Sequence, residues 1–581
     1  MLFVALTRRS VVGRLPSAQS REFSISPGWF LTCVTDNFLS RLSISPQEDE
    51  IAVCESLLAS LENREGDEVF VTARFQRFSR TLQVSVRPLS ALHVFYCVDV
   101  EGNFFLSTHL ALLRQAGVPI EPDPEVLPEF LIYRVVSPPR TLFRGIRRVP
   151  AAGDVTVQLD GDSLQVSELR FGYIPSSPIS GRPEAAMVEE VAGLLQASVS
   201  KLLPVAPRAA TLLSGGVDSS IVSTIARDQI SVRNTYSTAF PFDKVETNLE
   251  QKYALTAASA LSTRHTLFVP TAGDYLTGFI EALAAAETPL DHLQSVLLHL
   301  LFRHGMPDRI DMLLTGVSAD TAFGGASQFQ WRRTPSLRRR LASLPPSHLA
   351  LRLLAQRWTM AQQLSESIQD IQRLALPITD PLSPVWRVGA YGDFNWVQAH
   401  YGASRDDVTR FRRSLLQPFL DRPLDDQFVI FYLNFSGTGA EVWSKLAEDQ
   451  RKILYCPFES KEVLDAAFSI PWEIKLKSSK HILRRVARKL DVPELLLTRP
   501  KQSFGIVTNR WAEQGGPLEP LIAIAAKVVD IKQLRGLQGT SLSKSMTLWN
   551  LLNYAVLVRL FVRGESKQSL LDELAEQRLE R

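Results

Sequence analysis

The sequence predicts an α/β protein with two parts of different character, and three observations support this prediction. The first part, residues 1–173, consists mostly of short β-rich runs separated by polar turns. In the second part strands alternate with helices, which favours a parallel sheet with ligands at the carboxyl ends of its strands. The length of 581 residues is too great for a single hydrophobic core and indicates two or three domains.

Composition narrows the class of protein. A hydrophobic content of 45% with 22% charged residues is ordinary for a soluble globular chain. The 64 basic and 61 acidic residues give a net charge of +3, which indicates no global nucleic-acid-binding surface. The four cysteines show no CxxC pair and no metal-ligand spacing, which favours a reducing compartment. No apolar run reaches the roughly 18 residues of a membrane helix, so we expect a cytoplasmic protein without a membrane span.

The N-terminal residues allow two interpretations. Residues 1–21 contain four arginines and no acidic residue, as organellar transit segments do. Leu2–Leu6 reads equally well as a first buried strand, and we favour the strand. Three more strands are expected in this part, over residues 69–75, 92–98 and 104–107. A stretch rich in Pro, Ser and Gly follows, and we interpret 174–186 as a linker.

The stretch 211–220 reads as a short strand, a turn rich in glycine and serine, and the start of a helix. Gly215 and Gly216 allow unusual backbone dihedrals and a close approach to a ligand, and a helix N-terminus favours an anion. Three hydroxyl side chains surround the same position, those of Ser214, Ser219 and Ser220. Asp218 would repel a bare phosphate, so a bridging Mg²⁺ is expected. We interpret the stretch as a pyrophosphate site, with an ordinary glycine-rich turn as the alternative.

The run Ser-Gly-Gly-Val-Asp-Ser-Ser at 214–220 resembles the PP-loop of the ATP pyrophosphatases, in the form found in asparagine synthetases. It lacks the Gly-Lys-Ser/Thr of a Walker-type loop. The resemblance implies attack at the α-phosphate of ATP, which gives an acyl adenylate and pyrophosphate. It also implies a set of ATP-binding residues, namely Leu213, Ser214, Gly215, Gly216, Asp218, Ser219, Ser220, Ser237 and Gly316.

Downstream of this loop, three parallel strands are expected over residues 234–240, 263–269 and 311–316. The run 315–325 is similar to the second motif of the asparagine synthetases, which implies that Asp320 completes a Mg²⁺ site with Asp218. Those synthetases usually have Asp-Glu at this point, whereas this chain has Asp320-Thr321, and β-lactam synthetases also lack that glutamate. A helix-capping role is the alternative for Asp320 alone.

The last third of the chain is predicted to be helical. Residues 475–487 and 499–505 are similar to the family's Lys-x-x-Leu-Arg helix and Arg-x-Lys-x-x-Phe-Gly loop. The resemblance implies that Lys501 is catalytic, because it would neutralise charge that develops on the α-phosphate, and that Lys480 is a second phosphate contact. At 453–455, where the family often has a glutamate followed by x-Arg, this chain has Ile-Leu-Tyr. Three nearby carboxylates stay open as a replacement base: Glu441, Glu448 and Asp449.

Residues 1–173 resemble the glutamine amidotransferase domain of asparagine synthetases, through the run Thr-Leu-Phe-Arg-Gly-Ile at 141–146. The resemblance implies a layered antiparallel α+β domain, followed by an ATP-binding synthetase domain over 187–581. Glutaminases of this type use an N-terminal cysteine, and here the second residue is Leu2. The nearest cysteine, Cys33, lies in an apolar run typical of a core residue. We therefore expect a degenerate domain without glutaminase activity.

Four motifs in family order predict an amide ligase that uses ATP and Mg²⁺ and forms AMP and pyrophosphate. Loss of the glutaminase nucleophile favours an amine supplied by the substrate, as in lasso-peptide macrolactam synthetases and β-lactam synthetases. We favour the lasso-peptide type because the chain is long and its synthetase half is divergent. The alternatives are an asparagine synthetase fed by ammonia or glutamine, and a non-catalytic nucleotide-binding relative. Retention of Asp218, Asp320 and Lys501 counts against the non-catalytic alternative.

The expected partners follow from that function. The substrate would be a peptide or an amino-acid-derived carboxylate, and a precursor-peptide protease is a further candidate. The arginine-rich stretch 332–357 contains no acidic residue, and we expect it to be a solvated face. An anionic peptide or a carrier protein is the alternative ligand for that stretch.

Overall fold

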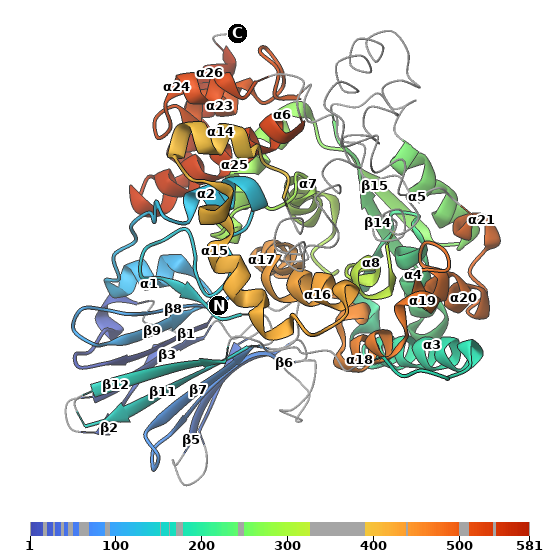
Figure 1. Ribbon diagram of the computed structural model, residues 1–581, viewed down its shortest axis with the longest axis horizontal. Helices are drawn as coiled ribbons and strands as arrows, with labels where there is room; N and C mark the ends of the chain where they lie inside the picture. The colour runs from blue at the N-terminus through green and yellow to red at the C-terminus, as the bar shows by residue number, and fades with distance from the viewer. Residues whose placement is uncertain are drawn as a thin grey trace.

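The structure, a computed structural model, describes residues 2–15, 20–26, 29–35, 40–44, 50–56, 69–86, 93–150, 153–161, 163–169, 178–241, 249–325, 390–436, 440–498, 511–538 and 542–579. It contains two antiparallel sheets near the N-terminus and one parallel sheet later in the chain (Figure 1). The predicted fold class, α/β with an antiparallel first part, is therefore confirmed.

Two six-stranded sheets stack face to face in the N-terminal part (Figure 1). The first contains β1 (Leu2–Thr7), β2 (Ser20–Ser26), β3 (Trp29–Thr35), β8 (Phe95–Val98), β9 (Phe104–Ser107) and β10 (Arg147–Arg148). Its order is β10-β8-β9-β1-β3-β2. The second contains β4 (Ser40–Ile44), β5 (Glu50–Ser56), β6 (Val69–Gln76), β7 (Thr81–Val86), β11 (Asp154–Asp160) and β12 (Ser163–Leu169). Its order is β12-β11-β7-β6-β5-β4, and the strand pairs in both sheets are antiparallel.

Strand β1 is buried on both of its faces. Leu2 and Val4 belong to the hydrophobic cluster between the two sheets. Phe3, on the opposite face, packs with α1 (Leu110–Ala116) and α2 (Leu127–Tyr133), which cover the first sheet. The alternation of side chains across a strand explains this double burial. The prediction of a buried strand at Leu2–Leu6 is confirmed.

The parallel sheet contains β13 (Ala209–Leu212), β14 (Asn234–Thr238), β15 (Arg264–Phe268), β16 (Met312–Leu314) and β17 (Ile453–Tyr455). Its order is β15-β14-β13-β16-β17, and the neighbouring strands are parallel. The three strands predicted after the phosphate loop are confirmed, because β14, β15 and β16 lie within the predicted residue ranges. Strand β17 was not predicted, because three residues are too few to show a periodicity.

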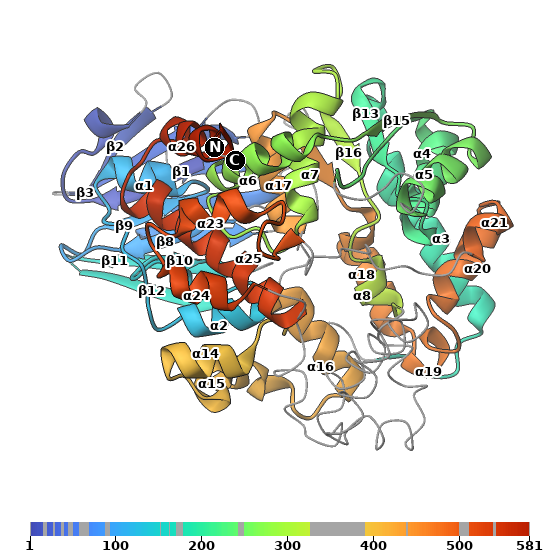
Figure 2. The same cartoon turned by 90° about the horizontal axis from the view of Figure 1, so that it is seen from above.

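Helices cover both faces of the parallel sheet. One hydrophobic cluster contains side chains of α3 (Glu184–Ser200), α4 (Val217–Ile230), α5 (Leu249–Ala260), α8 (Ala319–Phe323), α18 (Lys461–Ser469) and α20 (His481–Lys489). The other contains side chains of α6 (Ala272–Ala286), α7 (Gln294–Leu300), α17 (Ala440–Asp449), α23 (Glu519–Ala525) and α25 (Leu542–Leu557). Further helices are α14 (Phe394–Tyr401), α15 (Arg405–Leu416), α16 (Leu424–Phe431), α19 (Trp472–Lys475), α21 (Glu494–Leu497), α24 (Ile531–Gly536) and α26 (Lys567–Leu579). Figure 2 shows α23, α24, α25 and α26 gathered near α1 and α2.

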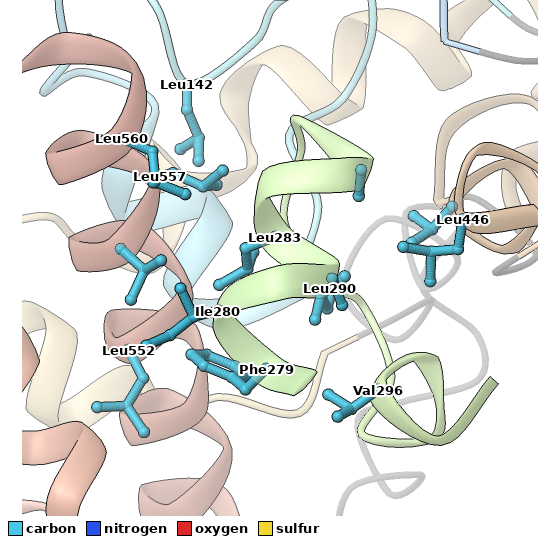
Figure 3. Close-up of a cluster of buried hydrophobic side chains, with 14 of the residues drawn as sticks. Leu142, Phe279, Ile280, Leu283, Leu290, Val296, Leu446, Leu552, Leu557 and Leu560 are labelled. Carbon is cyan, nitrogen blue, oxygen red and sulfur yellow. The ribbon is translucent and has the colours of Figure 1, made fainter. Parts of the chain in front are cut away.

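The hydrophobic cluster that contains α6 and α25 also includes side chains of the N-terminal part, so it joins the two parts of the chain. Leu142 of the N-terminal part lies beside Leu557 of α25 and Leu560, and Phe279 and Ile280 of α6 face Leu552 (Figure 3). The segment Ser543–Val562 is long and apolar enough to cross a membrane, with a mean hydropathy of 1.3. However, 89% of that window is buried, and α25 packs against α2, α6 and α23. This segment is therefore a core helix of the fold.

The predicted domain boundaries stay predictions. The linker expected at 174–186 starts among residues 170–177, which lie outside the described ranges, and α3 begins before its end, at Glu184.

Candidate active site

The predicted phosphate loop joins β13 to α4 at the carboxyl edge of the parallel sheet. Gly215 has a φ of +73°, and a Cβ atom there would lie 2.4 Å from the carbonyl oxygen of Tyr253 in α5. Glycine is therefore required at this position. The hydroxyl oxygens of Ser214 and Ser219 lie 3.1 Å apart, and the Ser214 N–H donates to Ser219 Oγ at 3.2 Å. These bonds hold the loop closed against the first turn of α4.

The start of α4 has the properties of an anion site. Gly216 is the N-cap residue of α4. Because glycine has no side chain, no N-cap side chain accepts a hydrogen bond from the first-turn N–H groups. Ser220 is completely buried, and its hydroxyl has no hydrogen-bond partner among the residues that the structure describes. Because α4 has 14 residues, its dipole also favours negative charge at this end. The loop thus has the features of an anion site, and its binding of a phosphate stays a prediction.

Gly316 lies against this same helix end. A Cβ atom at Gly316 would lie 2.7 Å from the amide nitrogen of Ser219 and 2.9 Å from Cβ of Asp218. Real Cβ contacts do not reach such distances, so glycine lets the loop after β16 approach α4. Gly316 therefore has a packing role that the sequence prediction did not include.

Asp218, Asp320 and Lys480 meet beside the phosphate loop. They come from α4, from α8 and from the N-cap position of α20. The Lys480 ammonium lies 2.7 Å from Asp320 Oδ1 and also donates a hydrogen bond to Asp218 Oδ2. Burial by itself lowers the pKa of Lys480, but the two carboxylates raise it above its ordinary value. The three side chains form a charged centre with the lysine between the acids.

This pair of carboxylates fits a Mg²⁺ ion that is bound together with a nucleotide. Mg²⁺ takes oxygen ligands, usually one or two carboxylates with substrate phosphates and waters. No group of three or more His, Cys, Asp or Glu side chains forms a metal site among the described residues. Asp218 and Asp320 would thus hold the ion only with phosphate oxygens as further ligands.

Contacts from three segments fix the centre. Ser318, just before α8, donates a hydrogen bond to Glu459, which is 1% exposed. The backbone N–H of Lys480 donates to the carbonyl oxygen of Gly324 at 3.0 Å. This bond joins the segment that carries Lys480 directly to the segment that carries Asp320.

Lys475 makes a second connection between these segments. Its side chain is completely buried, with Nζ 3.6 Å from the ring centroid of Trp472. It donates to the carbonyl oxygens of Ala467 at 2.9 Å and Ala322 at 3.3 Å. Burial lowers the pKa of Lys475 to about 7. Apart from the position of Lys475 within a motif, no sequence feature predicted this role.

Leu213 and Ser237 lie at neighbouring strand ends. The Leu213 N–H donates to the carbonyl oxygen of Tyr236 at 2.9 Å, which brings Ser237 beside the phosphate loop. The Ser237 hydroxyl is 2.9 Å from Nε2 of His265 in β15. The sequence prediction did not include His265.

Lys501 and the arginine-rich stretch 332–357 lie outside the described residues. The catalytic role of Lys501 and the solvated face expected for 332–357 therefore stay predictions.

The three carboxylates considered as a base have other partners. Glu441 accepts hydrogen bonds from His93 at 2.8 Å and Arg148 at 2.9 Å. Burial raises its pKa, but those two partners lower it overall. Glu448 is paired with Lys445 at 2.9 Å, and Asp449 is exposed on α17. A carboxylate whose pKa is lowered is a weak base, so Glu441 and Glu448 are poor candidates.

Leu2 and Cys33 are both core residues. The Leu2 side chain is 0% exposed, and its backbone N–H donates to Thr108 Oγ1 at 2.9 Å. Cys33 lies opposite Val4 in the pairing of β1 with β3, and burial raises the pKa of its thiol to about 12. A thiol of that kind is not a nucleophile at neutral pH.

The comparison with known families matches the asparagine synthase family to residues 190–550, which is more than half of the chain. The chain belongs to the asparagine synthase family. It is 23% identical over 532 residues to a Mycobacterium tuberculosis protein named putative asparagine synthetase (glutamine-hydrolyzing), covering 85% of this chain and 76% of that protein. It is 24% identical over 426 residues to asparagine synthetase (glutamine-hydrolyzing) 1 of Bacillus subtilis, covering 72% and 64%. It is also 22% identical over 481 residues to the amidase chyE of Penicillium rubens, covering 76% and 69%.

Membership of the asparagine synthase family supports an ATP-dependent carbon–nitrogen ligase. The matched range contains Asp218, Asp320 and Lys480, whose side chains meet beside the phosphate loop.

Proposed function

We propose that this chain adenylates a substrate carboxylate with ATP and then joins the acyl adenylate to an amine. In the first step a carboxylate oxygen attacks the α-phosphorus of ATP, and pyrophosphate leaves. In the second step the amine nitrogen attacks the acyl carbon, AMP leaves, and the nitrogen loses a proton. The reaction is balanced as carboxylate, amine and ATP giving amide, AMP and pyrophosphate.

The centre formed by Asp218, Asp320 and Lys480 is the observation that carries this proposal. It lies where a triphosphate on the α4 N-terminus would place its charged oxygens. A Mg²⁺ ion bound there would neutralise phosphate charge. Lys480 supplies a fixed ammonium at the same place, and a preorganised charge of this kind stabilises negative charge as it develops.

We further propose that the amine belongs to the substrate, so that the amide closes within one molecule. Cys33 is buried and the pKa of its thiol is raised to about 12, so it is not a glutaminase nucleophile, which supports a nitrogen source other than glutamine. A peptide with an Asp or Glu side-chain carboxylate and a free N-terminal amine is the substrate that we favour, as in lasso-peptide macrolactam formation. A precursor-peptide protease would then be a partner, and no nucleic acid would take part.

Incubation of the full-length protein with ATP, Mg²⁺ and candidate substrates tests the proposal. We expect AMP and pyrophosphate together with a peptide product lighter by one water. Lys501→Ala should bind ATP normally but lose product formation by about a hundredfold. Formation of ADP and phosphate in place of AMP and pyrophosphate would contradict the adenylation step.

A second candidate is the synthesis of asparagine with ammonia or glutamine as the nitrogen source, favoured by two relatives that are named as glutamine-hydrolyzing asparagine synthetases. The same assay with aspartate and ammonium as substrates distinguishes it from the peptide reaction. Asparagine formation, with no product from any peptide, would select this candidate. Release of glutamate from glutamine is measured with the wild-type protein and with Cys33→Ala. Release that persists in Cys33→Ala would show that a nucleophile other than Cys33 acts.

A further inference from the structure

A chain of four hydrogen bonds connects helix α5 to the edge of the candidate nucleotide site. Thr263 Oγ1 donates to the carbonyl oxygen of Ala258 at 3.4 Å, and Thr235 Oγ1 lies 3.0 Å from Thr263 Oγ1. Nδ1 of His265 lies 2.9 Å from Thr235 Oγ1. Nε2 of the same ring lies 2.9 Å from Ser237 Oγ. The three links between side chains have ordinary hydrogen-bond lengths, and the bond of Thr263 to Ala258 is longer.

The hydroxyls and the two ring nitrogens allow two directions along this chain of bonds, and we assign the one that starts with Thr263 donating to Ala258. A carbonyl oxygen only accepts, so Thr263 uses its single hydroxyl proton on Ala258, and Thr235 must donate to Thr263. Thr235 then has no proton left and accepts from Nδ1–H of His265. Burial lowers the pKa of His265, so the neutral ring carries one proton, and its Nε2 accepts from the Ser237 hydroxyl. Ser237 has thereby spent its only proton, and its oxygen is left as an acceptor.

The Ser237 oxygen lies at the edge of the sheet where a nucleotide would bind. Ser237 is half-buried at the carboxyl end of β14, next to the strand that leads into the phosphate loop. Ligands of parallel sheets lie at this edge. The nucleoside end of ATP offers N–H and O–H donors, namely the 6-amino group of adenine and the ribose hydroxyls.

We propose that His265 is a positioning residue that fixes Ser237 as a hydrogen-bond acceptor for a donor on the nucleoside of the bound nucleotide. The inference rests on the proposed ATP site. A serine with a free hydroxyl would donate or accept as needed and would tolerate either kind of ligand group. A serine held as an acceptor rejects a ligand that has lost the donor, because its oxygen is left unsatisfied. The arrangement therefore contributes selectivity among nucleotides.

The test measures dissociation constants of the full-length protein for three nucleotides by calorimetry. ITP lacks the amino group of ATP, and 2′-deoxy-ATP lacks one ribose hydroxyl. We expect the wild-type protein to bind one of these two at least about tenfold more weakly than ATP. A loss confined to ITP identifies the amino group as the donor, and a loss confined to 2′-deoxy-ATP identifies the ribose.

Three variants separate the positioning role from a structural one. Ser237→Ala removes the acceptor, and His265→Asn keeps a donor toward Thr235 while it removes the ring nitrogen that faces Ser237. Both should lose most of the selectivity ratio between ATP and its analogue. Thr263→Val frees the proton of Thr235 and should lose part of the ratio. Thr256→Val, which removes an exposed hydroxyl bonded to its own helix, is the matched control and should keep it.

Two results would overturn the inference and are distinguishable. If ATP binds and Ser237→Ala retains the wild-type selectivity ratio, the chain of bonds is structural only, and the proposed function stands. If the wild-type protein binds no ATP, the proposed function fails and the inference fails with it. Thermal melts of each variant show whether it folds, and Ser237→Ala is a small enough change to decide the question even if His265→Asn does not fold.

Discussion

Single residues carry the charge of the candidate centre. Lys480 is 6% exposed and lies between two carboxylates, so its ammonium balances part of their charge in the absence of nucleotide. Removing one partner from a buried group of charges leaves another uncompensated, which costs more than a surface ion pair contributes. The centre is therefore sensitive to changes that preserve shape but remove charge.

Asp320→Asn is the first test at this scale. The amide keeps the size of the side chain but removes the negative charge that Lys480, and a metal ion, would meet. We expect pyrophosphate release to fall by about a hundredfold or more, with little change in thermal stability because Asp320 is partly exposed. Asp160→Asn, an exposed acid at the end of β11, is the matched control. Normal turnover by Asp320→Asn would remove this residue from the site.

Lys475→Met tests the buried lysine beside the centre. The pKa of Lys475 is lowered to about 7, so the native state binds fewer protons than the unfolded chain between about pH 7 and its ordinary pKa of 10.5. The contribution of Lys475 to stability is therefore present above pH 10.5 and is lost as the pH falls through 7. We expect the melting temperature of Lys475→Met, relative to wild type, to be higher at pH 6 than at pH 9. Equal differences at both values would contradict the lowered pKa.

At the scale of elements, the site depends on close approach between the start of α4 and neighbouring backbone. Gly215 meets the backbone of α5, and Gly316 meets the first turn of α4. Neither contact leaves room for a methyl group. The first-turn amides of α4 are therefore fixed by packing from two sides as well as by the loop's own hydrogen bonds.

Gly316→Ala tests this packing. The new methyl group would overlap Ser219 and Asp218 and would push the loop after β16 away from α4. We expect ATP affinity to fall by about tenfold or more, with a destabilisation of about 1–3 kcal/mol typical of overpacking. Gly193→Ala in α3, where a Cβ atom would meet nothing within 4 Å, is the control. It should leave ATP affinity unchanged and raise stability by up to about 1 kcal/mol, because alanine favours a helix interior. An unaltered affinity for Gly316→Ala would show that the loop moves without consequence.

At the scale of the whole molecule, buried charges line the interface between the N-terminal sheets and the parallel-sheet region. Helix α17 contributes Glu441 and Lys445, which contact His93 at 2.8 Å and His109 at 2.7 Å in the N-terminal part. A cavity of about 50 Å³ lies at this interface, with Glu441 and Glu287 in its wall. The two parts of the chain are thus joined by polar contacts, among them the Arg148–Glu441 ion pair at 2.9 Å, as well as by the shared hydrophobic cluster.

Glu287→Gln tests this interface through pH. Glu287 is 5% exposed, accepts a hydrogen bond from the Leu110 N–H, and burial raises its pKa from 4.5 to about 7. The native state binds the Glu287 carboxyl proton more tightly than the unfolded chain does. The contribution of Glu287 to stability is therefore fully present below pH 4.5 and is lost as the pH rises through 7. The loss amounts to about 3 kcal/mol.

Glutamine keeps the acceptor for Leu110 and carries no charge. The melting temperature of Glu287→Gln, relative to wild type, should therefore be higher at pH 8 than at pH 5. Glu125→Gln, an exposed acid, is the control and should show no such pH-dependent difference. The same profile for Glu287→Gln and wild type would show that Glu287 does not titrate in this range.

The sequence by itself determined the features that depend on neighbouring residues. The phosphate loop was predicted from a few consecutive residues, because a glycine turn, hydroxyls and a helix start act within one segment. The strands β14, β15 and β16 were predicted from short runs with apolar, β-branched or aromatic residues, and they lie where expected. The burial of Leu2 and Cys33 followed in the same way from their apolar runs.

Only the tertiary structure decided which distant groups meet. Lys480 is 262 residues from Asp218, yet its ammonium lies between that acid and Asp320 because α20 packs against α4 and α8. The contact of His265 with Ser237 depends on the parallel pairing of β14 with β15. Gly316 has its packing role only because the first turn of α4 lies so close that a Cβ atom would overlap it. Hydrogen bonds, charge pairs and packing act over a few ångströms, and distances of that size between distant segments are set by the folded arrangement of strands and helices.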